Sequence, residues 1–393
     1  MPKTACFLTL AMAMMLGGCD LMPGNTAGEG APSAAASQAA APQDQLGARD
    51  PAPGATPPTG MADDQPRPVM QMQVVLDRLG FTPGVVDGKE GLSTRNALLG
   101  FQEANGLDQT GALDQPTTAA LAQWSNIPAT RVVTIPADFA AGPFEKLPAK
   151  AADQAKLKMM SYESLDEKLA ERFHTTVATL QALNPVGAAG ESSGAVPAMT
   201  NPVVAPTEES APTGLFQAGQ QIRVPNVGAD QIDAAAASDA AWRDTLAMLG
   251  VGSVQPKADR IVVSKSKGTL RAYDGAGKLV AMFTATMGSS HDPLPLGNWK
   301  ILGVAHNPPF HYNPALFWDV SDKAAKQLLP PGPNGPVGVV WIDLSKPHYG
   351  IHGTPSPETI GRAQSHGCVR LTNWDVARLA QMVSTSTKVE FQA

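Results

Sequence analysis

Cysteine is nearly absent from this chain of 393 residues, which has three, at positions 6, 19 and 368. Two of them lie in an N-terminal segment that has Lys3, an apolar run over 7–16 and then small residues, a pattern typical of a secretory signal. If Cys6 leaves with that signal and Cys19 is modified, Cys368 has no partner in an oxidising compartment. A structural disulfide within one chain is therefore excluded.

Basic clusters and long apolar runs are also lacking. The net charge is -6, the pI is near 5.7, and lysine and arginine are not clustered, which argues against nucleic acid as a partner. Beyond the first segment no apolar stretch is long enough to span a bilayer. We therefore expect any membrane attachment to use a lipid.

Large apolar residues are almost missing from 23–68, where Ala, Pro, Gly, Gln and Ser dominate. Such a segment cannot bury enough surface to fold. We predict a disordered Ala/Pro/Gly tether over 19–67, which can lift the rest of the protein away from a membrane. A second stretch of this kind, 187–213, is predicted as a disordered insertion in a later domain.

The end of the signal, Leu16-Gly17-Gly18-Cys19, resembles a bacterial lipobox. The resemblance implies a lipoprotein signal peptide over 1–18 and a lipid on Cys19, which becomes the first residue of the mature protein. It implies a location at the periplasmic face of a bacterial membrane, lipid-anchored and associated with the cell wall. An ordinary signal cleaved nearby, or a short uncleaved anchor, is the alternative.

Apolar residues recur at three- and four-residue spacing in three stretches, which predicts helices over 69–79, 94–105 and 117–124 joined by glycine turns. Within this bundle, Leu79-Gly80-Phe81, Val86-Asp87-Gly88 and Asn105-Gly106-Leu107 closely resemble the peptidoglycan-binding type 1 domain, which we assign to 68–126. The resemblance implies docking on cell-wall glycopeptide. A role as scaffold alone is the alternative.

A second helical pair is predicted over 162–185, and an alternating strand follows the insertion over 222–225. These elements, with Ala218-Gly219-Gln220 before the strand, resemble a LysM domain, whose two helices are flanked by strands that pair with each other. We assign this LysM-like domain to 155–228. Because the usual Gly-Asp of the first strand is missing, sugar binding and a purely architectural role both stay open.

From residue 260 onward the apolar period drops to two. Short β-rich runs cover 261–263, 269–273, 279–287, 299–304 and 337–344. We expect Asp274-Gly275 to turn the first hairpin and Asn373 to cap one late helix. The chain is therefore expected to be multidomain, with a small all-α three-helix bundle, a small LysM-like α+β module and, over 257–393, a mainly antiparallel β domain with a C-terminal helix.

Chemistry is concentrated in this last domain, where Ile351-His352-Gly353 is followed by Ser365-His366-Gly367-Cys368-Val369-Arg370. A thiol with a pKa of about 8.5 needs only a modest downward shift to react, and a nearby imidazole can supply it. A buried inert cysteine is the alternative. A zinc site of His348, His352, His366 and Cys368 is disfavoured, because neither a second spaced cysteine nor an H-E-x-x-H pattern is present.

These motifs closely resemble the catalytic domain of L,D-transpeptidases of the YkuD type over 260–391, and Pro295-Leu296-Gly297 matches the substrate loop of that family. The resemblance implies that Cys368 is the nucleophile and His352 its proton acceptor and donor. The backbone carbonyl of Gly353 would orient His352 in place of a third side chain. No cofactor and no metal are implied.

The resemblance also assigns the neighbouring residues. Amides at Gly367 or Cys368 would hold the developing oxyanion. Ser365 and Arg370 would bind substrate, with Arg370 facing a substrate carboxylate or, alternatively, Asp375. His366 would contact the substrate or tune the thiolate, unless it is a structural histidine.

The implied reaction is acyl transfer in peptidoglycan. Cys368 would attack the meso-diaminopimelate carbonyl of a stem tetrapeptide, release the terminal D-alanine and form a thioester, which an amine of a neighbouring stem resolves into a 3→3 cross-link. Water as acceptor would give a carboxypeptidase, and a protein lysine would give a wall-anchored protein. A non-catalytic wall-binding lipoprotein is the alternative of another class. The expected partners are peptidoglycan stem peptides and glycan, and a membrane through the lipid anchor.

Overall fold

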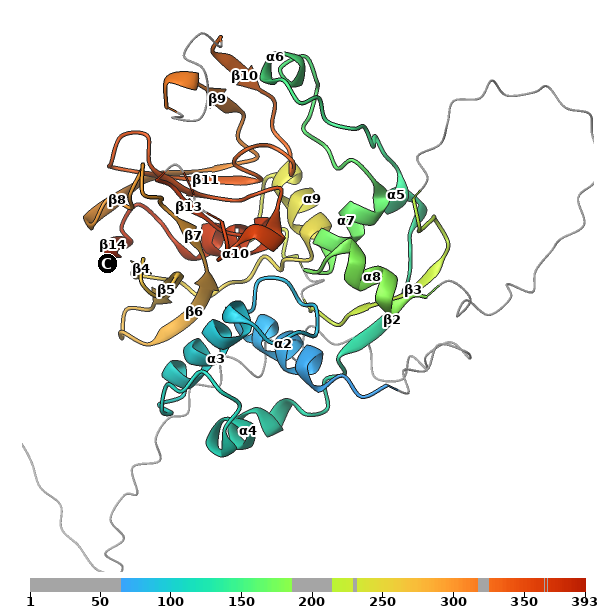
Figure 1. Ribbon diagram of the computed structural model, residues 1–393, viewed down its shortest axis with the longest axis vertical. Helices are drawn as coiled ribbons and strands as arrows, with labels where there is room; N and C mark the ends of the chain where they lie inside the picture. Colours follow the sequence, from blue (N-terminus) through green and yellow to red (C-terminus); the bar gives the residue numbers. More distant parts are fainter. Residues whose placement is uncertain (1–64, 186–213, 229–231, 317–324, 364, 366) are drawn as a thin grey trace, which may run out of the picture. The chain divides into compact units, whose positions relative to one another are not determined.

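The computed structural model describes residues 65–185, 214–228, 232–316, 325–363, 365 and 367–393 (Figure 1). Two predicted site residues, Cys19 and His366, lie outside the described residues. So do the predicted signal peptide, the predicted tether up to residue 64 and the whole 187–213 insertion. None of the helices in the described ranges is both long enough and apolar enough to cross a membrane.

Three helices form the first segment, as the apolar spacing predicted. They are α2 (Pro68–Leu79), α3 (Leu92–Ala104) and α4 (Gln115–Leu121), which continues into the short 3-10 helix η1 (Ala122–Trp124). Proline at the start of α2 suits the first helical position, and Gly80 ends the helix in the left-handed conformation, with φ +88°. Phe101 lies at the centre and packs edge-on against Phe81 and Trp124, with ring centroids 6.2 and 6.0 Å away.

A second helical pair follows. Helix α7 (Leu165–Arg172) begins at Ser164, and α8 (Val177–Leu183) begins at Thr176; both caps accept a backbone hydrogen bond through their side chains. Strand β3 (Gln221–Pro225) pairs antiparallel with β2 (Thr130–Thr134), and the short helices α5 (Ala137–Ala140) and α6 (Ala151–Gln154) come between β2 and α7. The paired strand predicted for a LysM-like module therefore lies upstream of the predicted start at 155.

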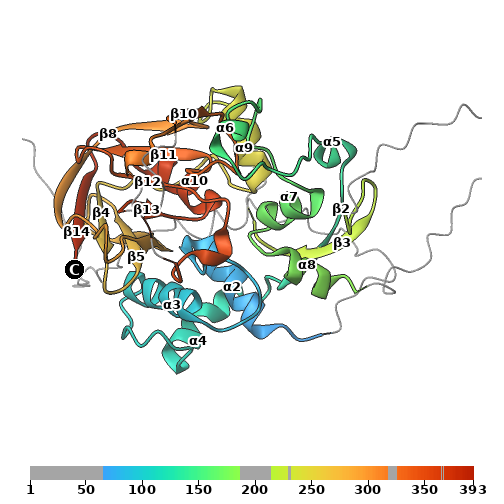
Figure 2. The ribbon, with the colours of Figure 1, turned by 45° about the horizontal axis from the view of Figure 1, so that its top comes forward.

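The C-terminal region is built on a ten-stranded sheet in the order β1-β6-β5-β4-β14-β8-β11-β12-β13-β7 (Figures 1 and 2). Its strands are β1 (Phe81–Thr82), β4 (Arg260–Ser264), β5 (Thr269–Tyr273), β6 (Leu279–Thr284), β7 (Thr286–Met287), β8 (Gly297–His306), β11 (Val340–Leu344), β12 (Gly350–His352), β13 (Val369–Arg370) and β14 (Lys388–Gln392). Neighbouring strands are antiparallel except at β1–β6, β4–β14 and β12–β13. The mainly antiparallel domain expected from the period-two pattern is thus present.

The long strand β8 joins the two halves of the sheet. Its first residues pair with β14, and Ile301 to His306 pair with β11. Strands β9 (Phe310–Tyr312) and β10 (Gln327–Leu329) form a separate antiparallel pair, with the 3-10 helix η2 (Pro314–Leu316) after β9. A further 3-10 helix, η3 (Pro357–Thr359), precedes the catalytic motif.

Three local predictions in this region were wrong. Asp274-Gly275 turns the second hairpin, β5–β6, because the first, β4–β5, turns at 265–268. Helix α10 (Asn373–Met382) is capped by Thr372, whose side chain accepts from the amide of Asp375, so Asn373 is the first helical residue. The chain does not end on that helix, since β14 follows it and pairs parallel with β4.

Helix α10 lies in the core of this region and contacts β11, β12 and α9 (Ala240–Leu249). Its apolar residues Val376, Leu379 and Ala380, and Val383 just after it, are buried. The opposite side is buried too, with Trp374 fully inaccessible. A helix buried on every side must find partners for its polar residues as well, and these partners come from the N-terminal segments.

The N-terminal helices share both sheet and core with the C-terminal region. Strand β1 adds to the edge of the large sheet, parallel to β6, with Phe81 opposite Met282. Helix α3 lies beside β6 in both ribbon views (Figures 1 and 2). One apolar cluster combines Leu76 and Phe101 with Leu180 of α8 and Met282 of β6. The three segments therefore pack on one another rather than being connected only by linkers.

A buried ion pair links the segments at this junction. Asp77 of α2 accepts two hydrogen bonds from the guanidinium of Arg378 on α10, at 3.0 and 2.8 Å, and lies 3.2 Å from Nδ1 of His174, between α7 and α8. Burial opposes the charge on Asp77, but Arg378 and His174 hold the pKa of Asp77 well below its usual range. The His174 ring stacks on Trp374, with centroids 4.9 Å apart.

We predict that Asp77→Asn lowers the free energy of unfolding by about 3–5 kcal/mol, because it leaves the guanidinium of Arg378 buried without its countercharge. Urea unfolding at pH 7 measures this change. The control is Asp153→Ala, which removes an exposed ion pair with Lys156 and is expected to leave stability almost unchanged. Equal effects of the two substitutions would contradict the structural role of the buried pair.

Candidate active site

The predicted base lies on β12, and the predicted nucleophile comes directly before β13, the parallel neighbour of β12. In the β12–β13 register Ile351 is opposite Val369 and His352 is opposite Arg370. Cys368, one residue before β13, therefore lies beside Gly350, whose amide donates a hydrogen bond to the thiol sulfur. Because side chains alternate along a strand, Cys368, His352 and Arg370 belong to the same face of the sheet.

The backbone and one aromatic ring hold His352 in place. Its side chain is buried, and Nδ1 lies 2.7 Å from the carbonyl oxygen of Gly353. A carbonyl can only accept, so Nδ1 carries the proton and Nε2 keeps the lone pair that a general base needs. The ring stacks on Trp341 of β11, its register partner, with centroids 5.5 Å apart. This is the backbone orientation of His352 that the motif led us to expect.

The electrostatics favour a neutral pair of thiol and imidazole. Burial, and then the charge of Arg370, lower the pKa of His352 to about 4. Burial raises the pKa of the Cys368 thiol, although the Gly350 amide and Arg370 oppose that rise. The sequence predicted a lowered thiol pKa, and this prediction was wrong, because burial raises that pKa. The thiol donates a long hydrogen bond to the carbonyl of His348, at 3.8 Å, so it must turn toward Nε2 to transfer its proton during attack.

Ser365 and Gly367 shape the loop around the nucleophile. The Ser365 hydroxyl donates to the carbonyl of Cys368 at 2.7 Å and accepts from the amide of Gly288 at 2.6 Å. With its hydroxyl engaged on both sides and its side chain buried, Ser365 fits a positioning role better than the substrate contact we expected. Gly367 has φ +96°, and a Cβ there would lie 2.5 Å from the ring of Tyr349.

Two predicted roles remain compatible with the geometry. Neither the Gly367 amide nor the Cys368 amide donates a hydrogen bond to another described residue, so both are available to an oxyanion. Of the two alternatives for Arg370, the structure disfavours Asp375, because its carboxylate faces Arg378 at 3.8 Å.

Residues outside the motif also border the thiol. The loop 288–296 connects β7 to β8 and contains Asp292, whose charge acts on both Cys368 and Tyr349. Pro295 in this loop accepts a hydrogen bond from the Trp299 indole at 2.9 Å, which anchors the predicted substrate loop. The sequence reasoning missed Asp292, Trp341 and Tyr349, since each lies outside the catalytic motif and only folding brings it near.

Asn373 supports the backbone next to the histidine. Its Oδ1 accepts from the amide of Val339 at 3.3 Å, and a Cβ on Gly353 would lie only 2.1 Å from that oxygen. Gly353 is therefore packed directly against the Asn373 amide group. Since the carbonyl of Gly353 orients His352, the position of Asn373 bears on the geometry of the base.

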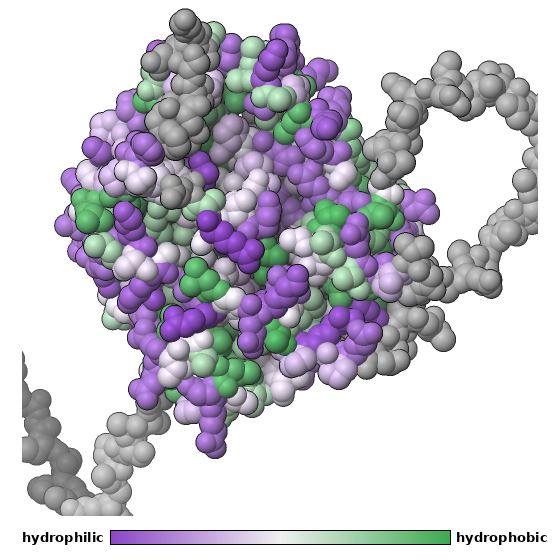
Figure 3. All heavy atoms as spheres, viewed as in Figure 1, coloured by the Kyte–Doolittle hydropathy of each residue, from purple (hydrophilic) through white to green (hydrophobic). Residues whose placement is uncertain are grey.

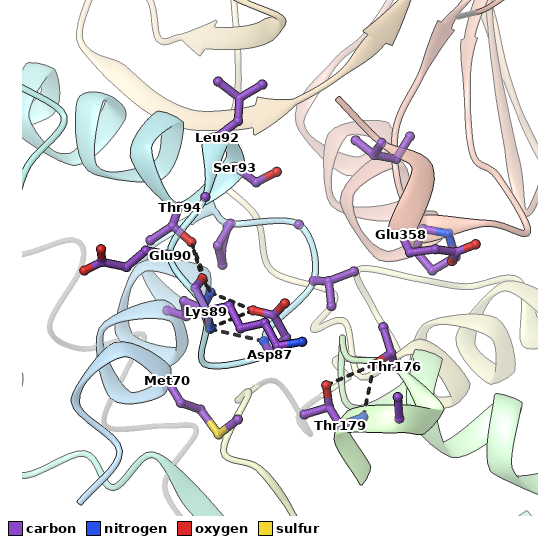
Figure 4. A pocket seen from close by; sticks show the side chains of 18 of the residues that line it. Met70, Asp87, Lys89, Glu90, Leu92, Ser93, Thr94, Thr176, Thr179 and Glu358 are labelled. Carbon is purple, nitrogen blue, oxygen red and sulfur yellow. Dashed lines mark hydrogen bonds between the residues drawn. The ribbon is translucent and has the colours of Figure 1, made fainter. Parts of the chain in front are cut away.

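A cleft of about 430 Å³ opens where the three segments meet (Figure 4). Its walls come from the start of α2, from 83–94, from α8 along its length and from 357–362, the segment that leads into the catalytic motif. Figure 4 shows polar side chains from the last three of these walls around it, among them Asp87, Lys89, Glu90, Ser93, Thr94, Thr176, Thr179 and Glu358. The cleft thus brings both helical segments and the catalytic loop to one place.

The rest of the described surface offers neither a metal site nor a large apolar patch on the face drawn in Figure 3. In the described part of the chain, no three His, Cys, Asp or Glu residues gather as metal ligands. On the face drawn in Figure 3, hydrophilic residues separate small apolar groups. Scattered exposed apolar side chains are ordinary on a protein surface and do not by themselves indicate a docking site.

Comparison with known proteins agrees with the site. Residues 258–391 match the family model of the L,D-transpeptidase catalytic domain. Residues 65–121 match a putative peptidoglycan binding domain, ahead of the L,D-transpeptidase domain. The LysM-like assignment of 155–228 stays a prediction.

Individual L,D-transpeptidases match parts of the chain. Putative L,D-transpeptidase YkuD of Bacillus licheniformis is 35% identical over 130 residues, which are 33% of this chain and 63% of that protein. Probable L,D-transpeptidase YbiS of Escherichia coli is 41% identical over 64 residues, 16% of this chain and 21% of that protein. The chain therefore spans less than two thirds of the length of either relative.

Solved structures of L,D-transpeptidases are also similar. L,D-transpeptidase 3 from Mycobacterium tuberculosis has 18% sequence identity and a TM-score of 0.29, covering 35% of this chain and 61% of that one. An L,D-transpeptidase from Mycobacterium smegmatis has 21% identity and a TM-score of 0.29, covering 35% of this chain and 59% of that one.

The pKa of His352 predicts the acid limb of activity. His352 must be neutral to accept a proton, so kcat/KM is expected to fall only as the pH drops through about 4. Arg370→Met removes a positive charge that lowers this pKa, so the limb should move to higher pH. The pH dependence of D-alanine release, recorded for the wild type and for Arg370→Met, measures the acid limb of each protein. Arg260→Met, an exposed cation on β4, is the control and should leave the limb in place. A limb near pH 6.5 that Arg370→Met does not move would contradict this account.

Proposed function

We propose that the protein is an L,D-transpeptidase that forms 3→3 cross-links between meso-diaminopimelate residues of peptidoglycan. The observation that carries this proposal is the placement of Cys368, immediately before β13, beside β12, which carries His352, with the Nδ1 proton of His352 directed to Gly353. The match of 258–391 to the L,D-transpeptidase catalytic domain supports the reaction class. The match of 65–121 to a peptidoglycan binding domain supports peptidoglycan as the partner.

The proposed reaction has two balanced halves. As Sγ of Cys368 attacks the diaminopimelate carbonyl carbon, its proton passes to Nε2 of His352. The amide bond breaks, and that proton leaves on the amine of D-alanine, so that a thioester remains. The acceptor amine then attacks the thioester and transfers its proton through His352 back to the sulfur. Amides of Gly367 and Cys368 stabilise the oxyanion in both halves.

The substrate is proposed to lie between two flanking features. Arg370, on the same strand face as His352, attracts a stem-peptide carboxylate, and the loop 288–296 brings the charge of Asp292 close enough to act on the thiol. The cleft of Figure 4 holds an adjoining part of the polymer, because hydroxyl and charged groups of the kind found there suit sugars and stem peptides. His366 lies outside the described residues, and its assignment to substrate or thiolate is unchanged.

Two features remain proposals from the sequence. We propose that Cys19 carries a lipid and that the segment before the helices is a tether, which together hold the enzyme at the periplasmic face of a membrane. Transfer to water or to a protein lysine uses the same thioester, so these L,D-carboxypeptidase and anchoring reactions differ from cross-linking only in the acceptor.

Cys368→Ala is expected to abolish cross-linking while the fold and binding to isolated cell walls persist, because it removes only the nucleophile. Mass spectrometry of muropeptides after incubation of purified sacculi with each protein measures the products. 3→3 dimers identify the transferase, and tripeptides without dimers identify the carboxypeptidase. Formation of 3→3 dimers by the Cys368→Ala protein would contradict the mechanism.

Metabolic labelling with palmitate tests the anchor. The wild-type chain should incorporate label, and Cys19→Ala should not, because the thiol is the site of acylation. Cys6→Ala is the matched control and should label normally. Undiminished labelling of the Cys19→Ala protein would reject Cys19 as the lipid site.

A further inference from the structure

The segment before α7 docks on a loop of the catalytic domain. The backbone amide of Met160 donates to the carbonyl of Pro331 at 2.8 Å, and the amide of Asn334 donates to the carbonyl of Met160 at 3.0 Å. The Asn334 side chain also donates to the carboxylate of Glu167, on α7, at 2.8 Å. Gly332 is packed so closely that a Cβ there would lie 2.3 Å from the Met160 carbonyl oxygen. These contacts fix the position of α7 relative to the loop 331–334.

From this docked helix one carboxylate reaches the catalytic domain. Glu171 of α7 is buried, and its Oε1 accepts a hydrogen bond from Nδ2 of Asn373 at 2.8 Å. The hydroxyl of Tyr162 donates to the other oxygen of the same carboxylate. A second acceptor for Nδ2 of Asn373 is the carbonyl of Pro333, at 3.0 Å, in the docked loop. One carboxylate oxygen of Glu171 is therefore held by Tyr162, and the other holds Asn373.

Asn373 passes this constraint on to the base. Its Oδ1 faces the backbone of Val339 and packs against Gly353 with no space for a Cβ between them. The carbonyl of Gly353 in turn accepts the Nδ1 proton of His352 at 2.7 Å. A short and fully buried chain of contacts thus connects Glu171 with the proposed catalytic histidine.

We propose that Glu171, supplied by a helix outside the catalytic domain, is a positioning residue for the His352 base. Through Asn373 it holds the Gly353 carbonyl at the distance that fixes the tautomer and tilt of the imidazole. The N-terminal modules then contribute to turnover itself, in addition to any role in binding the wall. This inference rests on the proposed function, because it concerns the geometry of the same base.

The substitution that tests this role is Glu171→Met, which keeps the volume of a buried side chain and removes the acceptor. We expect kcat for D-alanine release to fall by about 10- to 100-fold with little change in KM, because a small displacement of a catalytic group is costly while substrate contacts persist. Glu171→Gln keeps an oxygen acceptor for Nδ2 of Asn373 and should restore most of kcat. A merely structural side chain would not show this split between kcat and KM.

The matched control is Glu167→Met, one helical turn earlier on α7, which removes a contact with Asn334 but not with Asn373. Its kcat should fall far less than that of Glu171→Met, because the backbone contacts of Met160 still dock the helix. Thermal unfolding of each full-length variant verifies the fold, and Tyr162→Phe is a second probe should Glu171→Met unfold. By removing one hydrogen bond to the Glu171 carboxylate, Tyr162→Phe is expected to lower kcat by a smaller factor.

Two results would overturn the inference. A folded Glu171→Met protein with wild-type kcat would show that the contact between Glu171 and Asn373 does not position the base. If that variant unfolds, a Tyr162→Phe protein with wild-type kcat would show the same. Equal losses in Glu171→Met and Glu167→Met would show that docking in general, and not Asn373, is what matters. Different results would contradict the proposed function itself. These are a wild-type chain without activity, or a Cys368→Ala protein that releases D-alanine as fast as the wild type.

Discussion

The short parallel pairing of β12 with β13 is the constraint on which the proposed chemistry depends. Two register pairs are enough to place the thiol beside Gly350 and to put His352 and Arg370 next to each other. Each group then acts on its neighbour, since the guanidinium charge lowers the pKa of the imidazole and opposes the effect of burial on the thiol. A slip of one residue would move Cys368 to the opposite face of the sheet.

Such a short strand pair cannot hold itself together, so its surroundings must. Ser365 ties the Cys368 carbonyl to Gly288 at the end of β7, and Trp341 stacks on the histidine from β11. Helix α10 packs against β11 and β12, and two of its buried polar residues have partners in the N-terminal segments. Arg378 pairs with Asp77, and Asn373 bonds to Glu171. The helical modules are therefore part of the scaffold of the catalytic domain in this chain.

Local sequence patterns predicted much of the fold. The spacing of apolar residues located α2, α3, α7 and α8, and period-two runs located most strands, because these patterns reflect local burial. The parallel pairing of β14 with β4 and the addition of β1 to the large sheet could not be predicted, since they join residues far apart in the chain. Asn373 was expected to cap α10, but Thr372 does so, which frees the Asn373 side chain for contacts with other segments.

The site shows the same division. The motif alone indicated His352, Gly353 and Cys368, and the structure brings these residues together. Tyr349, Trp341 and Glu171 had no recognisable signal, because a buried aromatic ring or carboxylate acquires its role only from what folds against it. The prediction of a lowered thiol pKa was wrong for a related reason. A motif identifies the neighbours of a group but not its burial, and here burial affects the pKa of Cys368 more than its neighbours do.

The most direct test of acyl transfer at Cys368 is the intact mass of the full chain, quenched in acid after mixing with disaccharide-tetrapeptide. The account predicts an adduct equal to the substrate less D-alanine, located on the peptide that contains Cys368 and released by hydroxylamine, as a thioester requires. Release of D-alanine without any adduct on Cys368, or with an adduct on another residue, would contradict it.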